Sequence, residues 1–363
     1  MSRRPTGELR RGWTTGACAA AAARAALTAL LGGSFPDPVE IRLPRGERPS
    51  FPLALGERRG NAARAGIVKD AGDDPDVTHG ALVIAEVARG APGSGLVFEA
   101  GEGVGRVTRA GLPIAVGEAS ITAGPRAMIA EALDAAAADC GCERPPDLLV
   151  TLSIPGGAAL AAKTLNARLG ILGGLSILGT TGIVTPYSCA AWIHSIHRGI
   201  DVARAAGLEH LAASTGSTSE KAVQRLFGLP EIALIDMGDF VGGTLKYLRR
   251  HKVARLTLAG GFAKLAKLAA GHLDLHSGES HVDVEVLAST LAELGGDAAQ
   301  LAATRAAGSA GEVLTLAGAQ RSALAERVAR QAREVALATL AGGIAVDVAI
   351  FDRQGELIAH AGP

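Results

Sequence analysis

The stretch LAASTGSTSE, residues 211–220, joins a short apolar run to a turn of small and hydroxyl-bearing side chains. The run at 211–214 predicts a buried strand, and the residues after the turn predict a helix over 220–226. The alternation continues along the chain, with strands expected at 232–236 and 255–259 and helices at 193–206, 243–251 and 262–270. Strands that alternate with helices indicate βαβ units, so we expect a mostly parallel sheet in this half of the chain.

The turn holds Thr215, Gly216, Ser217, Ser219 and Glu220. Because it follows a strand and opens a helix, its backbone N–H groups and hydroxyls would point towards a carboxylate or phosphate of a ligand. These five residues are therefore candidates for binding a cofactor. An ordinary helix cap, with one of the two serines as N-cap, explains the same residues equally well.

Two further strand ends carry residues that suit a nucleoside. The strand at 232–236 closes on Asp236-Met237-Gly238-Asp239, and the strand at 255–259 closes on Gly260-Gly261. Ligands of parallel sheets bind beyond the carboxyl ends of the strands, and an acid at such an end suits a ribose diol. We predict that these residues complete a cofactor site together with the turn at 215–220.

The chain has 363 residues, which predicts two domains. We expect an α+β domain over 1–190 and a Rossmann-like α/β domain over 191–363. The elements expected in the first domain are a helix at 15–31 with Thr15 as its N-cap, a helix at 126–139, and strands at 39–43, 50–55, 65–69, 96–99 and 148–154. The second domain should end in a helix at 324–340 and a hairpin of strands at 346–351 and 356–360.

Composition excludes several classes of protein. Lys+Arg and Asp+Glu both number 36, and aromatic residues make up only 3% of the chain. A nucleic-acid binder normally carries a basic excess, and a single-strand binder also needs aromatic platforms, so we expect no nucleic acid as partner. The four cysteines form neither a disulfide framework nor a zinc pattern, which predicts a reducing, cytoplasmic setting.

One segment could be mistaken for a membrane span. The run at 169–193 carries no charge and is long enough to cross a bilayer. Repeated glycines and Pro186 would break such a helix, so we predict no membrane segment.

Acids and histidines offer possible chemistry at two places. The stretch 70–79 holds four aspartates, among them Asp70, and could bind a divalent cation or act as a base, although a solvated Asp-Pro turn fits it better. His272 and His276 are four residues apart, as metal ligands on one helix face would be. Because no third ligand stands at a fixed spacing, we predict a polar site lining and no metal held by the protein.

Glycine runs and cations complete the candidates. The run at 101–105 is a weak match to a dinucleotide loop and reads better as a strand turn, while the run at 174–181 has Thr180 where a P-loop needs lysine. Glycines there would let a flat molecule approach the backbone. Lys163 and Arg168 precede these glycines, and Lys264 and Lys267 follow Gly260-Gly261. In a neutral protein such local cations indicate a polyanionic small molecule rather than a polymer, and solvated helix residues remain the alternative.

A series of motifs carries a family resemblance. They are LRRGWTTGACA at 9–19, VKDAGDDPDVT at 68–78, GEGVGRVT at 101–108, IPGG at 154–157, KTLNARLGI at 163–171 with its continuation to 186, STG at 214–216, MGDF at 237–240, the run 260–271, and HS at 276–277. In this order they resemble the CbiD family, the cobalt-precorrin-5B (C1)-methyltransferases of anaerobic cobalamin biosynthesis. The sequence departs from the family pattern at Gly124-Pro125-Arg126 and at Ala263.

The resemblance implies transfer of a methyl group from S-adenosylmethionine to C1 of a cobalt-containing tetrapyrrole, which gives cobalt-precorrin-6A. The cobalt then belongs to the substrate. We expect the methionine carboxylate of the cofactor at the 215–219 turn and its ribose at Asp236 or Asp239, and we consider Asp70 and His276 for proton transfer. The residues expected to contact the tetrapyrrole or its carboxylates are Arg10, Thr14, Thr15, Lys163, Asn166, Arg168, Gly173, Gly174, Thr180, Thr181, Lys264 and Lys267.

Two other classes remain open, and so does assembly into a homo-oligomer. A nucleotide-dependent oxidoreductase could use the same parallel sheet, although no compact Gly-x-Gly-x-x-Gly opens a βαβ unit with an acid about 20 residues on. A non-catalytic tetrapyrrole-binding subunit would need the macrocycle site but not the site at 215–239.

Overall fold

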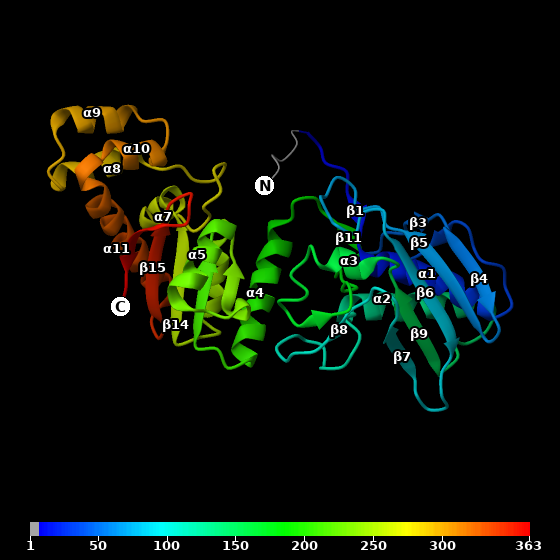
Figure 1. Cartoon of the computed structure of the whole chain (residues 1–363). Coiled ribbons are helices and arrows are strands. Elements are labelled where there is room, and N and C mark those ends of the chain that lie inside the picture. The colour runs from blue at the N-terminus through cyan, green and yellow to red at the C-terminus, as the bar shows by residue number, and fades with distance from the viewer. Residues whose placement is uncertain (1–6) are drawn as a thin grey trace. The chain divides into compact units, whose positions relative to one another are not determined.

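The structure is a computed structural model that describes residues 7–363. The chain divides into two compact units: unit 1 ends at Ser188, and unit 2 runs from Cys189 to Pro363 (Figure 1). Unit 1 mixes helices with several small sheets, and unit 2 has a single five-stranded sheet with helices on its faces. The predicted mixture of helices and strands is therefore confirmed.

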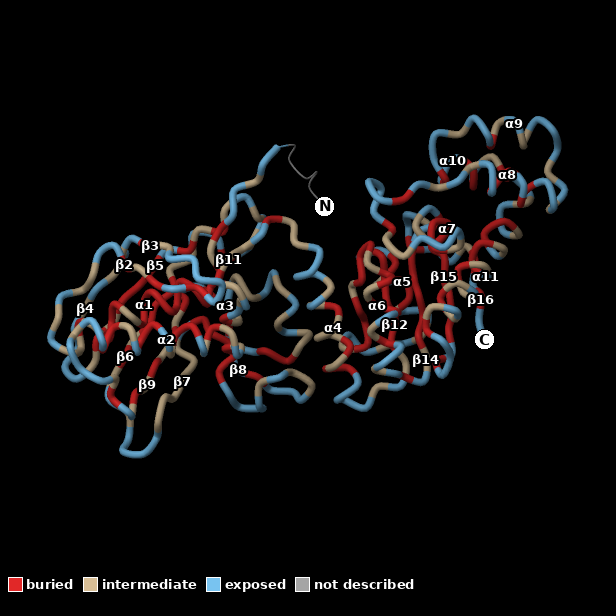
Figure 2. Tube along the Cα trace, turned by 180° about the vertical axis from the view of Figure 1, so that it is seen from behind, coloured by how far each residue is buried: buried red, intermediate tan, exposed pale blue. Residues whose placement is uncertain are grey.

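Unit 1 is built around an alanine-rich helix, α1 (Thr15–Leu30), which is almost wholly buried (Figure 2). Alanine has the highest helix propensity, which favours the helix. Its side chain is a single methyl group, so other elements can approach α1 closely. The sequence predicted Thr15 as N-cap, and this is wrong by one residue. Thr14 is the cap, and its Oγ1 accepts a hydrogen bond from the Ala17 N–H at 3.1 Å.

The main sheet of unit 1 packs on α1 and has the strand order β4-β5-β6-β9-β7. Its strands are β4 (Leu55–Arg59), β5 (Ala62–Val68), β6 (Leu82–Arg89), β7 (Leu96–Ala100) and β9 (Leu148–Ser153). Neighbours are antiparallel except β7 and β9, which run parallel. Strand β6 lies at the centre of the sheet and was not predicted, because a short apolar run does not distinguish a strand from a buried helix.

Smaller elements complete unit 1. Three antiparallel pairs join β1 (Gly12–Trp13) to β11 (Ile183–Val184), β2 (Val39–Glu40) to β3 (Ser50–Phe51), and β8 (Arg106–Val107) to β10 (Ile171–Leu172). The helices are α2 (Ala123–Asp139), which packs along α1, and the short α3 (Gly157–Ala161).

Unit 2 contains the parallel sheet that the sequence predicted. Its strand order is β13-β12-β14-β15-β16, with bounds β12 (His210–Ser214), β13 (Leu234–Asp236), β14 (Arg255–Gly261), β15 (Ala345–Phe351) and β16 (Leu357–Ala361). The first four strands are parallel, and β16 pairs antiparallel with β15, so the predicted hairpin is confirmed. Along the chain, β13 is added on one side of β12 and β14 on the other, so the direction of strand order reverses between β12 and β14. Ligands of parallel sheets bind at such a point.

Helices cover both faces of this sheet. Alternate residues of β12 point to opposite sides: Ala212 packs with α5 (Ser217–Phe227), whereas Leu211 and Ala213 pack in the larger core. That core also holds α4 (Cys189–Ala205), α6 (Val241–Leu248), α7 (Phe262–Ala269) and α11 (Arg321–Leu340). The single turns η1 (Glu231–Ala233) and η2 (Gly318–Gln320) precede β13 and α11.

Three helices of unit 2 were not predicted: α8 (Val284–Glu293), α9 (Ala298–Ala306) and α10 (Ala310–Leu316). Each begins at a polar residue whose side chain caps it, and these are Asp283, Asp297 and Ser309. The caps were visible in the sequence, but the helices have only seven to ten residues, so their apolar period is weak.

Candidate functional site

The carboxyl ends of β12, β13 and β14 lie side by side at one edge of the unit 2 sheet. The register pairs Ser214 with both Asp236 and Ala259, so β12 and β13 end at the same level and β14 runs two residues further, to Gly261. The Thr215 N–H donates to the Ala259 carbonyl at 2.9 Å, and the Met237 N–H donates to the Ser214 carbonyl at 3.0 Å. The structure therefore brings together the three turns that the sequence selected as a cofactor site.

The N-terminus of α5 is the first component of this edge. Its N-cap is Gly216, and no side chain caps the helix within the described residues. The Ser219 hydroxyl instead donates to the Gly216 carbonyl at 2.8 Å. The alternative interpretation, in which Ser217 or Ser219 is the N-cap, is therefore wrong. The first backbone N–H groups of α5 have no partner within their own helix and suit an anion.

Lys264 connects the ends of all three strands. It lies on α7, directly after β14, and its Nζ donates to the Thr215 carbonyl at 2.8 Å. The same Nζ lies 3.0 Å from Oδ1 of Asp239, in the turn after β13. Lys264 was predicted to pair with substrate carboxylates, but in this structure its ammonium is engaged by groups of unit 2.

A close approach between β14 and β12 explains one glycine of the site. A Cβ added at Gly260 would lie only 2.8 Å from Thr215 Oγ1, whereas one added at Gly261 meets nothing within 4 Å. Gly261 is the N-cap of α7, which also has no side-chain cap. Two helices thus begin uncapped at neighbouring strand ends.

The turn after β13 contains Asp236, Met237, Gly238 and Asp239. Gly238 has a φ of +54°, a left-handed conformation that favours glycine. Met237 is fully buried, and Asp239 is only 8% exposed. The Asp239 carbonyl accepts from the Leu275 N–H at 2.9 Å, so the main chain of this turn is fixed while Asp236 stands at the sheet edge.

Lys267 and His276 differ in their surroundings. Lys267 is buried, and its Nζ donates to the Leu275 carbonyl at 2.9 Å. Burial lowers the pKa of Lys267. These contacts give it a structural role in the loop after α7, which argues against a pairing with substrate. His276 is exposed, and its Nδ1 accepts from the Gly278 N–H at 3.1 Å.

The acidic stretch of unit 1 is tied to neighbouring groups. Lys69 is 1% exposed and lies 2.7 Å from Oδ2 of Asp76. Burial opposes ionisation of Asp76, but the Lys69 ammonium and the hydrogen bonds from Thr78 lower its pKa. The other three acids also accept hydrogen bonds: Asp70 from Arg10 and Gly72, Asp73 from the Arg10 N–H, and Asp74 from the Tyr187 N–H.

Asp70 and Arg10, predicted for proton transfer and for substrate binding, form an ion pair with each other. The hydrogen bond from Arg10 lowers the pKa of Asp70 to about 2. A carboxylate this acidic is a weak base at neutral pH, and its two oxygens are engaged by Arg10, so both observations argue against Asp70 as the proton-transfer group.

The glycine-rich segments of unit 1 pack against one another. A Cβ at Gly174 would lie 2.1 Å from the Gly103 carbonyl oxygen, and Asn166 Nδ2 donates to the Gly174 carbonyl at 3.0 Å. Gly103 has a φ of +71° in the turn between β7 and β8, so the run at 101–105 is the strand turn that we favoured. Gly173, in contrast, has open space around its Cβ position.

The threonines predicted to contact substrate are mostly engaged within unit 1. Thr14 and Thr15 are buried, and Thr15 Oγ1 both donates to the Leu178 carbonyl and accepts from its N–H. Thr181 donates to the Ile183 carbonyl at 3.3 Å. Thr180 and Lys163 are exposed, and Arg168 is half-buried.

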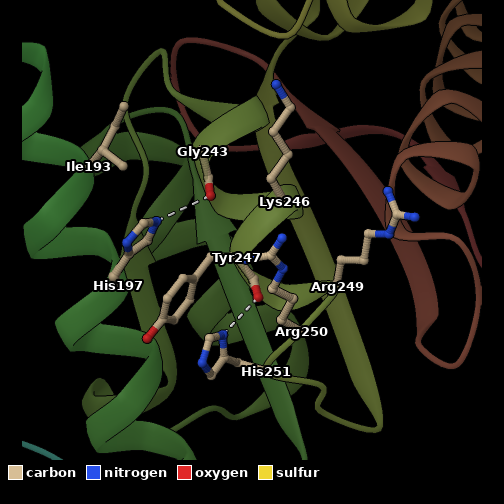
Figure 3. Close-up of a pocket in the computed structure, with 8 residues that line it drawn as sticks. All are labelled: Ile193, His197, Gly243, Lys246, Tyr247, Arg249, Arg250 and His251. Carbon is tan, nitrogen blue, oxygen red and sulfur yellow. Dashed lines mark hydrogen bonds between the residues drawn. The ribbon is translucent and has the colours of Figure 1, made fainter.

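A cavity of about 740 Å³ lies between α4 and α6 in unit 2 and was not predicted (Figure 3). Tyr247 stacks between His197 and His251, with ring centroids 3.8 and 3.9 Å apart. Tyr247 donates to Asp201 at 2.7 Å, and burial together with this acid raises its pKa to about 12. Lys246, Arg249 and Arg250 also line this cavity.

Trp192 is a second residue that the sequence analysis missed. It lies in the first turns of α4, and its Nε1 donates to the Asp236 carbonyl at 3.3 Å. The available signal was its rarity, because the chain has only two tryptophans.

Within residues 7–363, no group of three or more His, Cys, Asp or Glu side chains is arranged to hold a metal ion. In the same range no helix combines the length and the apolar character that crossing a bilayer requires.

Comparison with known proteins gives a uniform result. A family model described as CbiD matches residues 2–186, and one described as CbiD, C-terminal domain, matches residues 274–362. A relative named cobalt-precorrin-5B C(1)-methyltransferase from Paramagnetospirillum magneticum is 60% identical, over 97% of this chain and 98% of its own. A relative of the same name from Methylorubrum extorquens is 59% identical, over 98% of each chain.

One solved structure is also similar. It is a cobalamin biosynthesis protein, cbiD, from Archaeoglobus fulgidus, with 28% sequence identity and a TM-score of 0.40. The match covers 70% of this chain and 78% of that one.

Proposed function

Because this chain belongs to the CbiD family, we propose that it methylates C1 of cobalt-precorrin-5B in cobalamin biosynthesis, with S-adenosylmethionine as the donor. Methyl transfer at this carbon is the activity named in relatives that match nearly the whole chain. The observation that carries the donor site is the uncapped start of α5 at the point where the strand order reverses.

The reaction requires the methyl donor and the acceptor carbon to be held in line, and it needs few reactive side chains from the protein. A methyl group leaves a sulfonium for a carbon of an electron-rich macrocycle, and the sulfonium is already a good leaving group. Holding the two partners in line can lower the barrier by about 7–11 kcal/mol. The tetrapyrrole brings its own cobalt, so the side chains at the sheet edge need to orient the donor and exclude water.

The donor fits the Rossmann-like edge of unit 2 in one orientation. Its carboxylate lies at the backbone N–H groups of Ser217 and its neighbours at the start of α5, where the helix dipole favours an anion. Its ribose lies at the end of β13, where Asp236 or Asp239 accepts from the hydroxyls. Lys264 neutralises Asp239 at 3.0 Å and keeps the turn in place.

Unit 1 has a surface that suits part of an amphipathic macrocycle. Its segment at 171–178 points Ile171, Leu175 and Ile177 inwards. Leu172 and Leu178 are each 53% exposed, and the backbone at Gly173 is open. Lys163, also exposed, offers a cation for a peripheral carboxylate.

The donor site is tested by Asp239→Ala. Removal of this carboxylate should raise the dissociation constant of S-adenosylhomocysteine at least tenfold in calorimetry, because a ribose partner and the anchor of Lys264 are both lost. Glu293→Ala, an exposed acid on α8, is the control and should bind as the parent does. An unchanged constant in the Asp239 variant removes this role.

The activity itself is tested by mass spectrometry of the pigment after incubation with S-adenosylmethionine and the tetrapyrrole intermediate. The pigment should gain one methyl group. A protein that binds the pigment but neither methylates it nor binds S-adenosylhomocysteine would be a carrier, and the proposal would fail.

A further inference from the structure

Trp192 is exposed where apolar side chains are normally covered. It is one of two tryptophans in a chain with 3% aromatic residues, and its exposed fraction is 37%. Tryptophan is large and strongly buried on average, and it is enriched where proteins contact ligands and partners. A partly exposed indole at the edge that carries the candidate site therefore points to a contact with the ligand.

The indole is fixed to the ribose turn. Its Nε1 donates to the Asp236 carbonyl at 3.3 Å. A Cβ placed on Gly238 would lie 3.5–3.7 Å from Nε1, Cε2 and Cζ2, so one side of the indole packs against this glycine. The left-handed φ of +54° at Gly238 shapes the turn beneath the ring. Any movement of Trp192 is thus coupled to the turn that holds Asp236 and Asp239.

The order of groups along the sheet edge gives the direction of a bound donor. The start of α5 follows β12, the acids follow β13, and β13 is the outermost strand on that side of the sheet. Helix α4 packs against β13. A donor with its carboxylate at α5 and its ribose at β13 directs the next group, its base, towards Trp192.

We propose that the exposed part of the Trp192 indole is the stacking platform for the adenine ring of the methyl donor. This assignment rests on the proposed function, because it requires an adenosyl ligand at the sheet edge. Stacking on an aromatic side chain suits a flat base and needs no hydrogen-bond pattern. The bond from Nε1 to Asp236 then links recognition of the base to the position of the ribose turn.

The test uses the fact that the two tryptophans lie in different units, Trp13 in unit 1 and Trp192 in unit 2. Trp13 belongs to unit 1 and packs against Phe51 with ring centroids 5.5 Å apart, so Trp13→Phe keeps an aromatic ring there and leaves Trp192 as the sole tryptophan. Titration of this variant with S-adenosylhomocysteine should change Trp192 emission with the same dissociation constant as calorimetry gives. Adenosine alone should also change the emission, and L-methionine should not.

Two substitutions separate stacking from a structural role. Trp192→Ala should raise the dissociation constant of S-adenosylhomocysteine roughly tenfold or more, a loss typical of a base–aromatic stack. Trp192→Phe keeps a ring without the indole N–H and should restore most of the affinity. Circular dichroism and thermal unfolding of both variants, compared with the parent, check that unit 2 is still folded.

The outcomes distinguish this inference from the proposed function. Calorimetric binding with unchanged Trp192 emission, or a folded Trp192→Ala variant that binds as tightly as the parent, overturns the platform and leaves the donor site intact. A response to L-methionine but not to adenosine also overturns it. Absence of calorimetric binding in the parent protein overturns both.

Discussion

Unit 1 and unit 2 both carry glycine-rich turns beside charged side chains, but the glycines do different things. In unit 1, Gly174 lets one backbone segment rest on another, with no room for a Cβ beside Gly103. In unit 2, Gly216 and Gly261 have open space at the Cβ position and begin helices that no side chain caps. Gly174 thus serves packing within unit 1, whereas Gly216 and Gly261 leave the starts of α5 and α7 uncovered.

The charged groups of both units are engaged by neighbours. The acids of the 70–76 stretch in unit 1 are satisfied by neighbours, and Lys69 is buried with its partner Asp76. At the sheet edge of unit 2, Lys264 bridges strand ends that also bear Asp236 and the start of α5. A dense motif is thus not by itself a site, because close packing alone can require the same residues.

The largest effect is expected for Gly174→Ala. The new Cβ would lie 2.1 Å from the Gly103 carbonyl oxygen, and a backbone atom cannot move aside as a flexible side chain can. We expect unit 1 to lose about 3 kcal/mol of unfolding free energy or more. Urea unfolding followed by Trp13 fluorescence in a Trp192→Phe background measures this. Gly216→Ala is the matched control, followed by Trp192 fluorescence in a Trp13→Phe background because Gly216 lies in unit 2. Equal losses in the two variants would erase the contrast between the units.

Next comes Asp76→Asn, which leaves the buried ammonium of Lys69 without its anion. Removing one partner of a buried pair costs about 3–5 kcal/mol, and we expect about 2 kcal/mol because Asp76 is 26% exposed. The same urea assay reports on it. Arg10→Ala, which breaks an exposed pair, should leave the midpoint nearly unchanged. A stable Asp76 variant would show that Lys69 finds water or another partner.

Gly260→Ala tests the site in unit 2. Its Cβ would lie 2.8 Å from Thr215 Oγ1 and displace the turn ahead of α5, so the dissociation constant of S-adenosylhomocysteine should rise about tenfold, or about 1.4 kcal/mol. Gly311→Ala, on α10 and outside the candidate site, places a Cβ no closer than 4.0 Å to a neighbouring atom and should bind within twofold of the parent. If calorimetry finds the two variants alike, the close approach at Gly260 has no part in the site.

The smallest effect is on stability as a function of pH. Burial lowers the pKa of His194, His197 and His210 in unit 2. The unfolded chain, with histidine pKa values near 6.5, binds these protons first, so the unfolding free energy of unit 2 should fall as pH drops below about 6.5. Denaturation followed by Trp192 emission in the Trp13→Phe protein at pH 7.5 and 5.5 checks this.

His197→Phe keeps a ring against Tyr247 and removes one titrating group, so this variant should lose less stability between the two pH values. An unchanged pH dependence would assign the effect to other groups.

Much of unit 2 could be predicted because its signals are local. The strands at 211–214 and 255–259 are followed by residues rich in glycine, serine and threonine or by a glycine pair, which indicates where each strand ends. Parallel pairing then brings those ends to one edge of the sheet. Strand β6 and the helices α8 to α10 could not be predicted, because a short apolar run does not separate a strand from a buried helix and a short helix has a weak apolar period.

The candidate site was predictable to the level of its turns but not of its side-chain contacts. Nothing local says that Lys264 bonds Thr215, that Lys267 is buried, or that Arg10 meets Asp70 sixty residues on. Trp192 was missed because it lies on a helix that precedes the first strand of the sheet. Its place beside Asp236 follows only from the fold.

The alanine helix α1 has a consequence for how this protein tolerates sequence change. Most buried side chains of α1 are single methyl groups, so large-to-small substitutions, which leave cavities in most protein cores, can remove little volume there. Enlargement is the dangerous direction, because each extra carbon must push away a neighbouring backbone. Variation along α1 should therefore be one-sided, confined to residues as small as those already there.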